Sequence, residues 1–170
     1  MASPAPRRQP RRFDSPEQEA YLNLWRTYDR LRMIEDELFS THGLTAQQYN
    51  ALRLLRGEHP NALPTLVLAG KLVSHAPDIT RLVDRLEELG FVLRQRMPDN
   101  RRVVQVGITD AGLALLKQLD VPVRDCHQRQ LGHLSTGQLQ SLVELLRGAR
   151  QPHEVEGSAW GGNIKEEGGR

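Results

Sequence analysis

Arginine side chains gather in one short stretch of the chain, residues 94–102. This stretch contains a single acid among four arginines: Arg94, Arg96, Asp99, Arg101 and Arg102. Because a guanidinium group is always charged and matches the geometry of phosphate oxygens, such a cluster is typical of nucleic-acid contacts. An extended arginine also suits the narrow minor groove of DNA, where the potential is most negative. The residue types therefore favour nucleic-acid binding over a solvated surface loop.

The arginines flank the tip of a predicted β-hairpin. Residues 91–96 (FVLRQR) and 103–108 (VVQVGI) alternate roughly with the period of two that strands show. The residues between them include the turn formers Pro98, Asp99 and Asn100. The spacing thus predicts two short antiparallel strands with an arginine-rich tip.

A helix is predicted directly before the hairpin. Its apolar residues recur at the spacing of one buried helix face: Ile79, Leu82, Val83, Leu86 and Leu89. Ser74 is placed to cap the first free amides, and Pro77 falls in the first turn, where a missing N–H costs little. Gly90 then ends the helix, because glycine readily adopts the left-handed conformation found there.

The opposite face of this helix is polar. It holds Pro77, Thr80, Arg81 and Asp84, whereas acids in the second half of the helix would repel phosphates. Only the first two turns therefore suit a DNA groove, entered N-terminus first, as the helix dipole favours. Taken alone, the helix is more typical of an ordinary amphipathic helix with a solvated face. The arginine-rich hairpin that follows it favours a winged helix-turn-helix instead.

Capping signals predict further helices. Ser15, followed by Pro16 and Gln18, opens a long helix that runs to Phe39. A capping box at 45–48 opens a helix to about residue 57, and a second box at 135–138 opens the last one. A short helix is predicted at 64–72, and Thr109 caps another helix in which Pro122 should cause a kink or a restart.

The predicted fold class is mainly α with a small β-hairpin: a winged helix-turn-helix domain plus terminal dimerisation helices. The terminal helices have more apolar residues than a compact winged-helix module needs, so their stripes should meet a partner surface. Packing within one chain is the alternative. We expect a disordered basic arm at 1–14, a domain at 15–150 and a disordered tail at 151–170. Within the domain, the winged-helix core spans about 44–108, between dimerisation helices at about 15–42 and 109–150.

Composition narrows the possible sites. The chain has 170 residues and a formal net charge of +2, so a DNA-binding surface must arise by clustering of its arginines. Its one cysteine, Cys126, excludes an internal disulfide and a cysteine-based zinc site, and we expect an inert buried thiol. No apolar run approaches the ~18 residues of a membrane span, and the N-terminus lacks an apolar signal segment. We expect a cytoplasmic protein without a metal or cofactor.

The order and spacing of these motifs resemble the MarR family of winged-helix transcriptional regulators. The similarity rests on LTAQQYNALRLL (44–55), ITRLVDRLEELGFV (79–92), DNRR (99–102), ITDAGLALL (108–116) and LSTGQLQSLVELL (134–146). It implies a two-fold dimer in which the first and the last two helices interleave. Such a dimer would bind a pseudo-palindromic operator whose half-sites lie about one helical turn apart.

The resemblance assigns DNA contacts to two groups of residues. In the recognition helix these are His75, Pro77, Asp78, Thr80 and Arg81. In the wing, Asp99 and Arg101 match the family's Asp-x-Arg element, with Arg101 entering the minor groove and Asp99 orienting the wing. Arg94, Arg96 and Arg102 would support them through phosphates.

Asp78 departs from the commoner family pattern, which has small Ser and Thr residues before the shared Thr-Arg pair. An acid beside phosphate is costly unless it meets a cytosine amino group or pairs internally. The family often has an effector pocket where the dimerisation helices meet the DNA-binding lobe. Candidates for its walls and anchors are Trp25, Tyr28, His42 and Tyr49. Each of these, taken singly, also fits a plain core aromatic or a helix-end histidine.

The predicted function is sequence-specific binding of double-stranded DNA by a homodimeric repressor that a small aromatic or phenolic ligand releases. The alternative is a winged-helix protein–protein module, a corepressor or antirepressor that does not bind DNA. The wing arginines favour the first, because a module that never meets phosphate has little use for them. An enzyme is not indicated, since the sequence has no nucleophile–base pair, paired carboxylates or glycine-rich phosphate loop.

Overall fold

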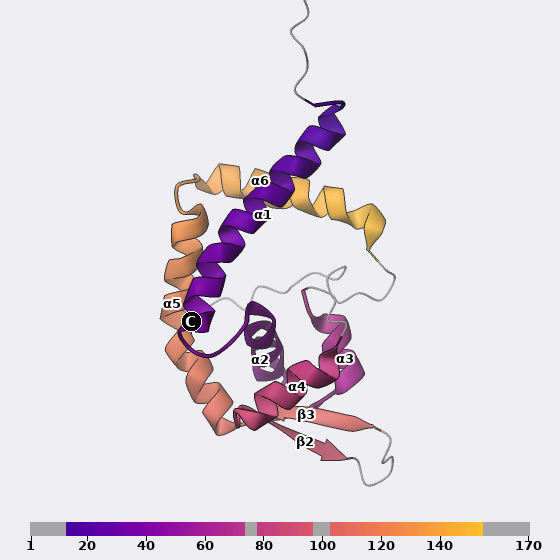
Figure 1. The fold of residues 1–170 in the computed structure, drawn as a ribbon, viewed down its shortest axis with the longest axis vertical. Helices are drawn as coiled ribbons and strands as arrows, with labels where there is room; N and C mark the ends of the chain where they lie inside the picture. Colours follow the sequence, from indigo (N-terminus) through magenta and orange to yellow (C-terminus); the bar gives the residue numbers. More distant parts are fainter. Residues whose placement is uncertain (1–12, 74–77, 97–102, 155–170) are drawn as a thin grey trace, which may run out of the picture.

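A computed structural model describes residues 13–73, 78–96 and 103–154 of the chain. The fold is mainly helical with a small antiparallel sheet, as predicted (Figure 1). Its elements are α1 (Pro16–Ser40), α2 (Ala46–Glu58), β1 (Leu63–Pro64), α3 (Thr65–Lys71), α4 (Ile79–Glu88), β2 (Val92–Arg96), β3 (Val104–Ile108), α5 (Asp110–Leu131), α6 (Thr136–Arg150) and a 3₁₀ turn (Gln151–His153).

Side-chain caps fix where the helices begin. The hydroxyl of Ser15 accepts from the amide of Gln18 at the start of α1, and Thr109 caps α5 in the same way. Capping boxes open α2 at Thr45 and α6 at Ser135. These predicted helix starts are confirmed. They could be predicted because each capping signal is local and needs no tertiary partner.

The apolar core belongs to a winged-helix lobe, which we define as residues 39–123. Its buried side chains come from the end of α1, from α2 to β3, and from the first half of α5. On α4, the predicted apolar stripe is confirmed: Leu82, Val83 and Leu86 are buried. Gly90 has a φ of 75° after the helix, the left-handed conformation in which glycine is favoured.

The sheet has the strand order β1-β3-β2, and both strand pairs are antiparallel. In the hairpin, Val92 pairs with Ile108 and Arg96 with Val104, so the two predicted antiparallel strands are present. Helix α5 follows the hairpin and packs closely against it at Gly112. A Cβ atom at that glycine would overlap the carbonyl oxygen of Phe91 and the side chain of Ile108, so no larger residue fits without a shift.

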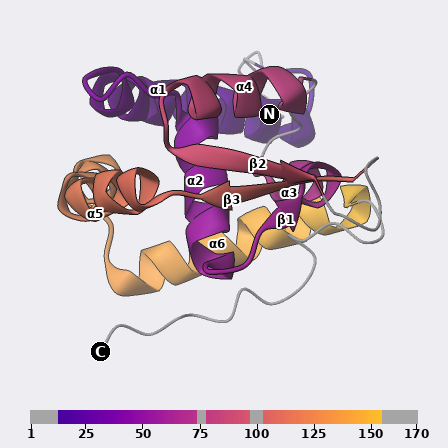
Figure 2. The same cartoon turned by 90° about the horizontal axis from the view of Figure 1, so that it is seen from below.

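The terminal helices differ from the lobe. Phe39 is the only buried residue of α1, and the described residues of α6 include none. The two views together show that α6 crosses α1 only in projection, since α1 and α6 lie on opposite sides in Figure 2. Helix α1 packs on α5, where Gln130 donates to the carbonyl of Leu31 over 2.9 Å. Among the described residues, no helix combines the length and apolar character needed to cross a membrane.

Three local predictions change in the structure. The N-cap of α4 is Asp78 and not Ser74, because its carboxylate accepts the amide of Arg81 and starts the helix at Ile79. Of the kink or restart predicted at Pro122, the restart does not occur: α5 runs through Pro122, since Val123 and Cys126 beyond it are buried and hold the second half in place. The tail predicted from residue 151 begins with a 3₁₀ turn to His153. The wing tip and both chain ends lie outside the described residues.

Candidate nucleic-acid interface

The helix-turn-helix pair is α3 and α4, and polar contacts hold α3 at both ends. At its start, the hydroxyl of Thr65 donates to the carbonyl of Val104 on β3 over 3.1 Å. At its end, Lys71 Nζ lies 2.5 Å from a carboxylate oxygen of Glu58 on α2. Just beyond, the amide of Val73 donates to the side chain of Asn50 over 3.0 Å. These contacts fix the platform on which α4 lies.

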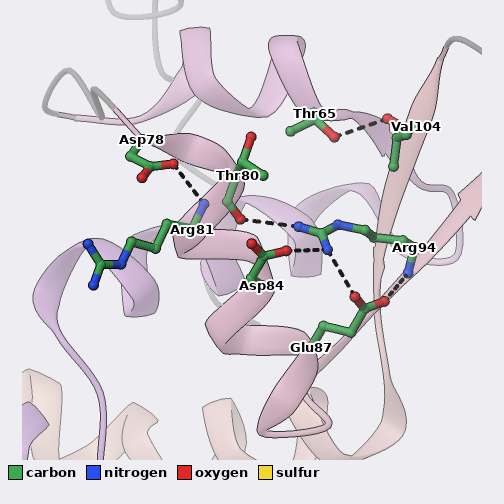
Figure 3. A network of polar contacts seen from close by, with 8 residues as sticks. All are labelled: Thr65, Asp78, Thr80, Arg81, Asp84, Glu87, Arg94 and Val104. Atoms are coloured by element: carbon green, nitrogen blue, oxygen red, sulfur yellow. Dashed lines mark hydrogen bonds and ion pairs between the residues drawn. The ribbon is translucent and has the colours of Figure 1, made fainter.

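The first turn of α4 presents polar groups to solvent. Asp78, Thr80 and Arg81 are all exposed. One carboxylate oxygen of Asp78 is 2.9 Å from the amide of Arg81, so the acid is paired internally as a helix cap. Figure 3 shows the guanidinium of Arg81 pointing away from the polar cluster beside it. Thr80 and Arg81 are therefore accessible at the start of the helix.

Arg94 lies between the hairpin and α4, facing the helix. Its Nη1 is 2.5 Å from Asp84 and 3.1 Å from Glu87, and its Nη2 donates to the carbonyl of Thr80 over 3.1 Å (Figure 3). Its backbone amide also donates to Glu87 over 3.1 Å. The guanidinium of Arg94 is thus bound within the protein. It faces α4, whereas the sequence-based expectation was a contact with a DNA phosphate.

The acids in the second half of α4 are also paired. Glu87 binds Arg94, and Glu88 lies 3.0 Å from Arg85. Because these ion pairs are partly exposed, each one stabilises the fold only modestly. They do offset the negative charge that would otherwise repel a DNA backbone. Arg96, at the outer end of β2, is exposed.

Helix α4 and the hairpin lie together at the end of the molecule opposite α6 (Figure 1). Three of the five predicted recognition-helix contacts, Asp78, Thr80 and Arg81, are at the exposed start of α4. The other two, His75 and Pro77, lie outside the described residues, as do Asp99, Arg101 and Arg102 of the wing. The roles assigned to all of these residues stay predictions.

Comparison with known proteins identifies this arrangement. The model of the MarR family matches residues 44–104, which cover α2 to the start of β3. A solved structure of a MarR transcription factor from Planctomyces limnophilus is 60% identical, with a TM-score of 0.64 over 80% of this chain and 98% of that one. This chain belongs to the MarR family.

More distant relatives share the same fold. The structure of BpsR from Bordetella bronchiseptica, whose DNA binding is regulated by 6-hydroxynicotinic acid, is 24% identical. It has a TM-score of 0.71 over 85% of this chain and 99% of that one. The transcriptional repressor MprA of Escherichia coli strain K12 is 24% identical over 139 residues, 81% of this chain and 79% of MprA.

The four ligand-pocket candidates of this MarR-family chain do not meet in one place. Trp25 and Tyr28 are exposed on the first half of α1, and Trp25 borders an open hollow formed only by residues 13–29. Tyr49 is buried, with its ring centre 4.5 Å from that of Phe39. His42 bonds within its own turn, to Thr41 and the carbonyl of Leu38. A pocket built from all four is therefore not formed by the described part of a single chain.

Burial shifts the titration of a few groups near the junction of α1, α2 and α5. It raises the pKa of the Tyr49 hydroxyl, of the Glu35 carboxyl and of the Cys126 thiol. A raised thiol pKa leaves less of the reactive thiolate, as expected for an inert buried cysteine. The described residues contain no group of three or more His, Cys, Asp or Glu side chains arranged to hold a metal ion.

Sequence reasoning missed the role of Thr65 and the partners of Arg94. The signal for the second was present, because Thr80, Asp84 and Glu87 recur at i, i+4 and i+7 on one helix face. Arg94 follows Gly90 closely enough to fold back along that face. Which of the nearby acids Arg94 pairs with depends on how β2 packs on α4, and no local sequence pattern determines that packing.

Proposed function

We propose that this MarR-family protein is a homodimeric repressor that binds a pseudo-palindromic operator in double-stranded DNA. The observation that supports this best is the exposed start of α4, where Thr80 and Arg81 project beside an internally paired Asp78. Arginine at such a position suits a guanine edge or a phosphate, and threonine suits a thymine methyl or a phosphate. The similarity to MprA, a transcriptional repressor, supports repression over activation.

The surface of the terminal helices supports a homodimer. Aromatic side chains remain exposed on α1, with Tyr21, Trp25 and Tyr28 each more than half accessible, and Leu145 of α6 is 72% exposed. Monomeric proteins rarely leave such a set of large apolar groups in water. A second copy that covers them by two-fold symmetry would place two copies of α4 on one face of DNA.

An effector site is proposed between the terminal helices and the lobe of the dimer. BpsR, which shares this fold, has its DNA binding regulated by 6-hydroxynicotinic acid, a small aromatic acid. Trp25, Tyr28, His42 and Tyr49 stay candidates for such a site only if the partner copy brings them together. We expect the protein to act in the cytoplasm.

Titration against DNA tests the proposed function. The purified full chain is added to labelled duplex from its own upstream region, with excess nonspecific DNA, at two salt concentrations. We expect tight binding that survives the competitor, with a steep salt slope from phosphate contacts. Arg101→Ala should weaken binding by roughly 1–3 kcal/mol without changing the dimer. Adding 6-hydroxynicotinic acid to the complex tests whether a small aromatic acid releases the protein from DNA.

Absence of binding at either salt would contradict the proposal and favour the protein–protein module. Binding with no preference for the upstream duplex would contradict operator recognition, while leaving a general affinity for DNA. If Arg101→Ala binds as tightly as the natural chain, the wing tip does not take part in recognition.

A further inference from the structure

Arg94 connects the strand that leads into the wing with the whole length of the recognition helix. Its three partners on α4 are Thr80, Asp84 and Glu87. At a rise of ~1.5 Å per residue these partners span about 10 Å of the helix. The side chain of Arg94 is 25% exposed, less than any other arginine with a recorded ion pair among the described residues. One residue thus holds β2 along α4.

The type of each contact explains why arginine occupies this position. A planar guanidinium presents several N–H groups in fixed directions, so it can bind two carboxylates and a carbonyl at once. Lysine has a single compact charge and cannot bridge all three in one geometry. The carbonyl of Thr80 belongs to the exposed first turn, so the network reaches the end of α4 that faces DNA in the proposed function.

The second strand of the hairpin is also tied to the helix-turn-helix pair. Thr65, at the start of α3, donates to the carbonyl of Val104 at the start of β3. Figure 3 shows both contacts, with Arg94 joining β2 to α4 and Thr65 joining α3 to β3. The base of the wing therefore has a defined orientation relative to both α3 and α4.

We propose that Arg94 is a positioning residue that fixes the wing relative to the recognition helix and contacts no DNA phosphate. The inference rests on the proposed function only for its effect on operator binding. The network itself is a property of the free protein. A phosphate could reach Arg94 only by competing with two carboxylates that already surround its guanidinium.

The two roles of Arg94 predict opposite results for one variant. Asp84→Asn with Glu87→Gln removes two negative charges near DNA and both ion pairs of the guanidinium, while the carbonyl of Thr80 stays. If Arg94 binds phosphate, this variant binds the operator more tightly. If Arg94 is a positioning residue, the variant binds about tenfold more weakly, because the wing is no longer aligned with α4. Gln at 87 keeps an acceptor for the amide of Arg94.

Arg94→Gln completes the test. We expect a loss of similar size in operator affinity, an unchanged affinity for nonspecific DNA, and an unchanged slope of log K against log salt. Combining it with the double variant should give no further loss, since both remove the same network. Arg94→Lys should not restore operator affinity. A slope reduced by about 1 would assign Arg94 to a phosphate and overturn the proposal.

Control variants and a DNA-free measurement separate this inference from the proposed function. Glu88→Gln removes an acid of α4 that pairs with Arg85 instead, and it should not weaken operator binding. Hydrogen exchange of the β2 amides in the free protein should quicken in Arg94→Gln while thermal unfolding changes little. Unchanged exchange would overturn the positioning role even if the natural chain binds no DNA.

Discussion

The winged-helix lobe and the terminal helices contain similar apolar residues but differ in how far they bury them. The lobe buries leucines such as Leu52, Leu55 and Leu116 completely within one chain. The terminal helices hold their large apolar groups, Trp25 and Leu145 among them, in solvent. Both regions contain helices with full capping boxes, α2 and α6. Local signals therefore suffice to specify a helix, whereas burial shows which region is complete in a single chain.

Polar contacts differ in the same way. In the lobe most of the ion pairs join different elements, as in Arg94 to α4, Lys71 to Glu58, and Arg56 to Asp120 over 2.9 Å. In the terminal helices several stay within one helix or its end, such as Arg32 to Asp36. The contacts of the lobe fix the mutual orientation of its elements. Those of the terminal helices mostly support the helices themselves and fix less of their mutual orientation.

The largest expected effect tests whether the lobe is complete in one chain. Leu52→Ala should lower the free energy of unfolding by about 2–5 kcal/mol, because it leaves a cavity at a fully buried position. The loss should be the same at every protein concentration, measured by urea unfolding. Leu66→Ala is the matched control, at a leucine of α3 that is 82% exposed, and should change stability by less than about 0.5 kcal/mol.

A Leu52→Ala effect that depends on protein concentration would contradict the comparison. It would mean that the core of the lobe is stabilised by a second copy, so the two regions would not be separable. The same urea series on Leu66→Ala shows whether replacing an exposed leucine has any effect by itself.

The second effect tests whether the terminal helices need a partner. Trp25→Ala should weaken the dimer by about 2 kcal/mol, or roughly 30-fold, since large aromatic groups dominate most interfaces. Trp25 is 61% exposed in the single chain, and its ring centre is 6.2 Å from that of Tyr21. Analytical ultracentrifugation over a dilution series measures the change, with Leu66→Ala again as the control. An unchanged dimer would place the interface elsewhere.

Much of the fold could be predicted from the sequence because its determinants are local. The caps at Ser15, Thr45, Thr109 and Ser135, and the turn at Gly90, lie within a few residues of the elements that they begin or end. The apolar stripe of α4 and the period of the hairpin are equally local. The restart that the sequence offered as one outcome at Pro122 does not occur, because tertiary burial of Val123 and Cys126 outweighs the lost hydrogen bond.

The candidate site was predictable in outline and not in detail. The residue types placed Thr80 and Arg81 on the exposed face of a helix, and the structure has them there. Two alternatives were left for Asp78, and the structure shows the internal pairing, with Arg81 as the partner. The partners of Arg94 and the hydrogen bond from Thr65 to Val104 depend on contacts between separate elements. Sequence spacing alone does not determine such contacts.

The smallest expected effect concerns Glu35, where α1 joins the lobe through α5. Burial raises the pKa of its carboxyl above the ordinary 4.5, and nearby His127 only partly opposes the shift. A folded-state pKa above the unfolded value means that folding favours the protonated acid. The contribution of Glu35 to stability should therefore be most favourable below pH ~4.5, become less favourable as the pH rises through the raised pKa, and then level off.

Glu35→Gln should remove that fall, because the amide never ionises. The variant should match the natural chain in acid and melt at a slightly higher temperature at neutral pH, as measured by thermal unfolding between pH 4 and pH 8. Glu37→Gln is the control on the exposed side of α1, where it loses an ion pair with Arg129 and should gain no stability. If Glu35→Gln is instead less stable at neutral pH, the attraction between Glu35 and His127 outweighs burial. The junction of α1 and α5 would then depend on specific polar pairing, as the wing does at Arg94. At that point the terminal helices would resemble the lobe in having polar contacts that join separate elements.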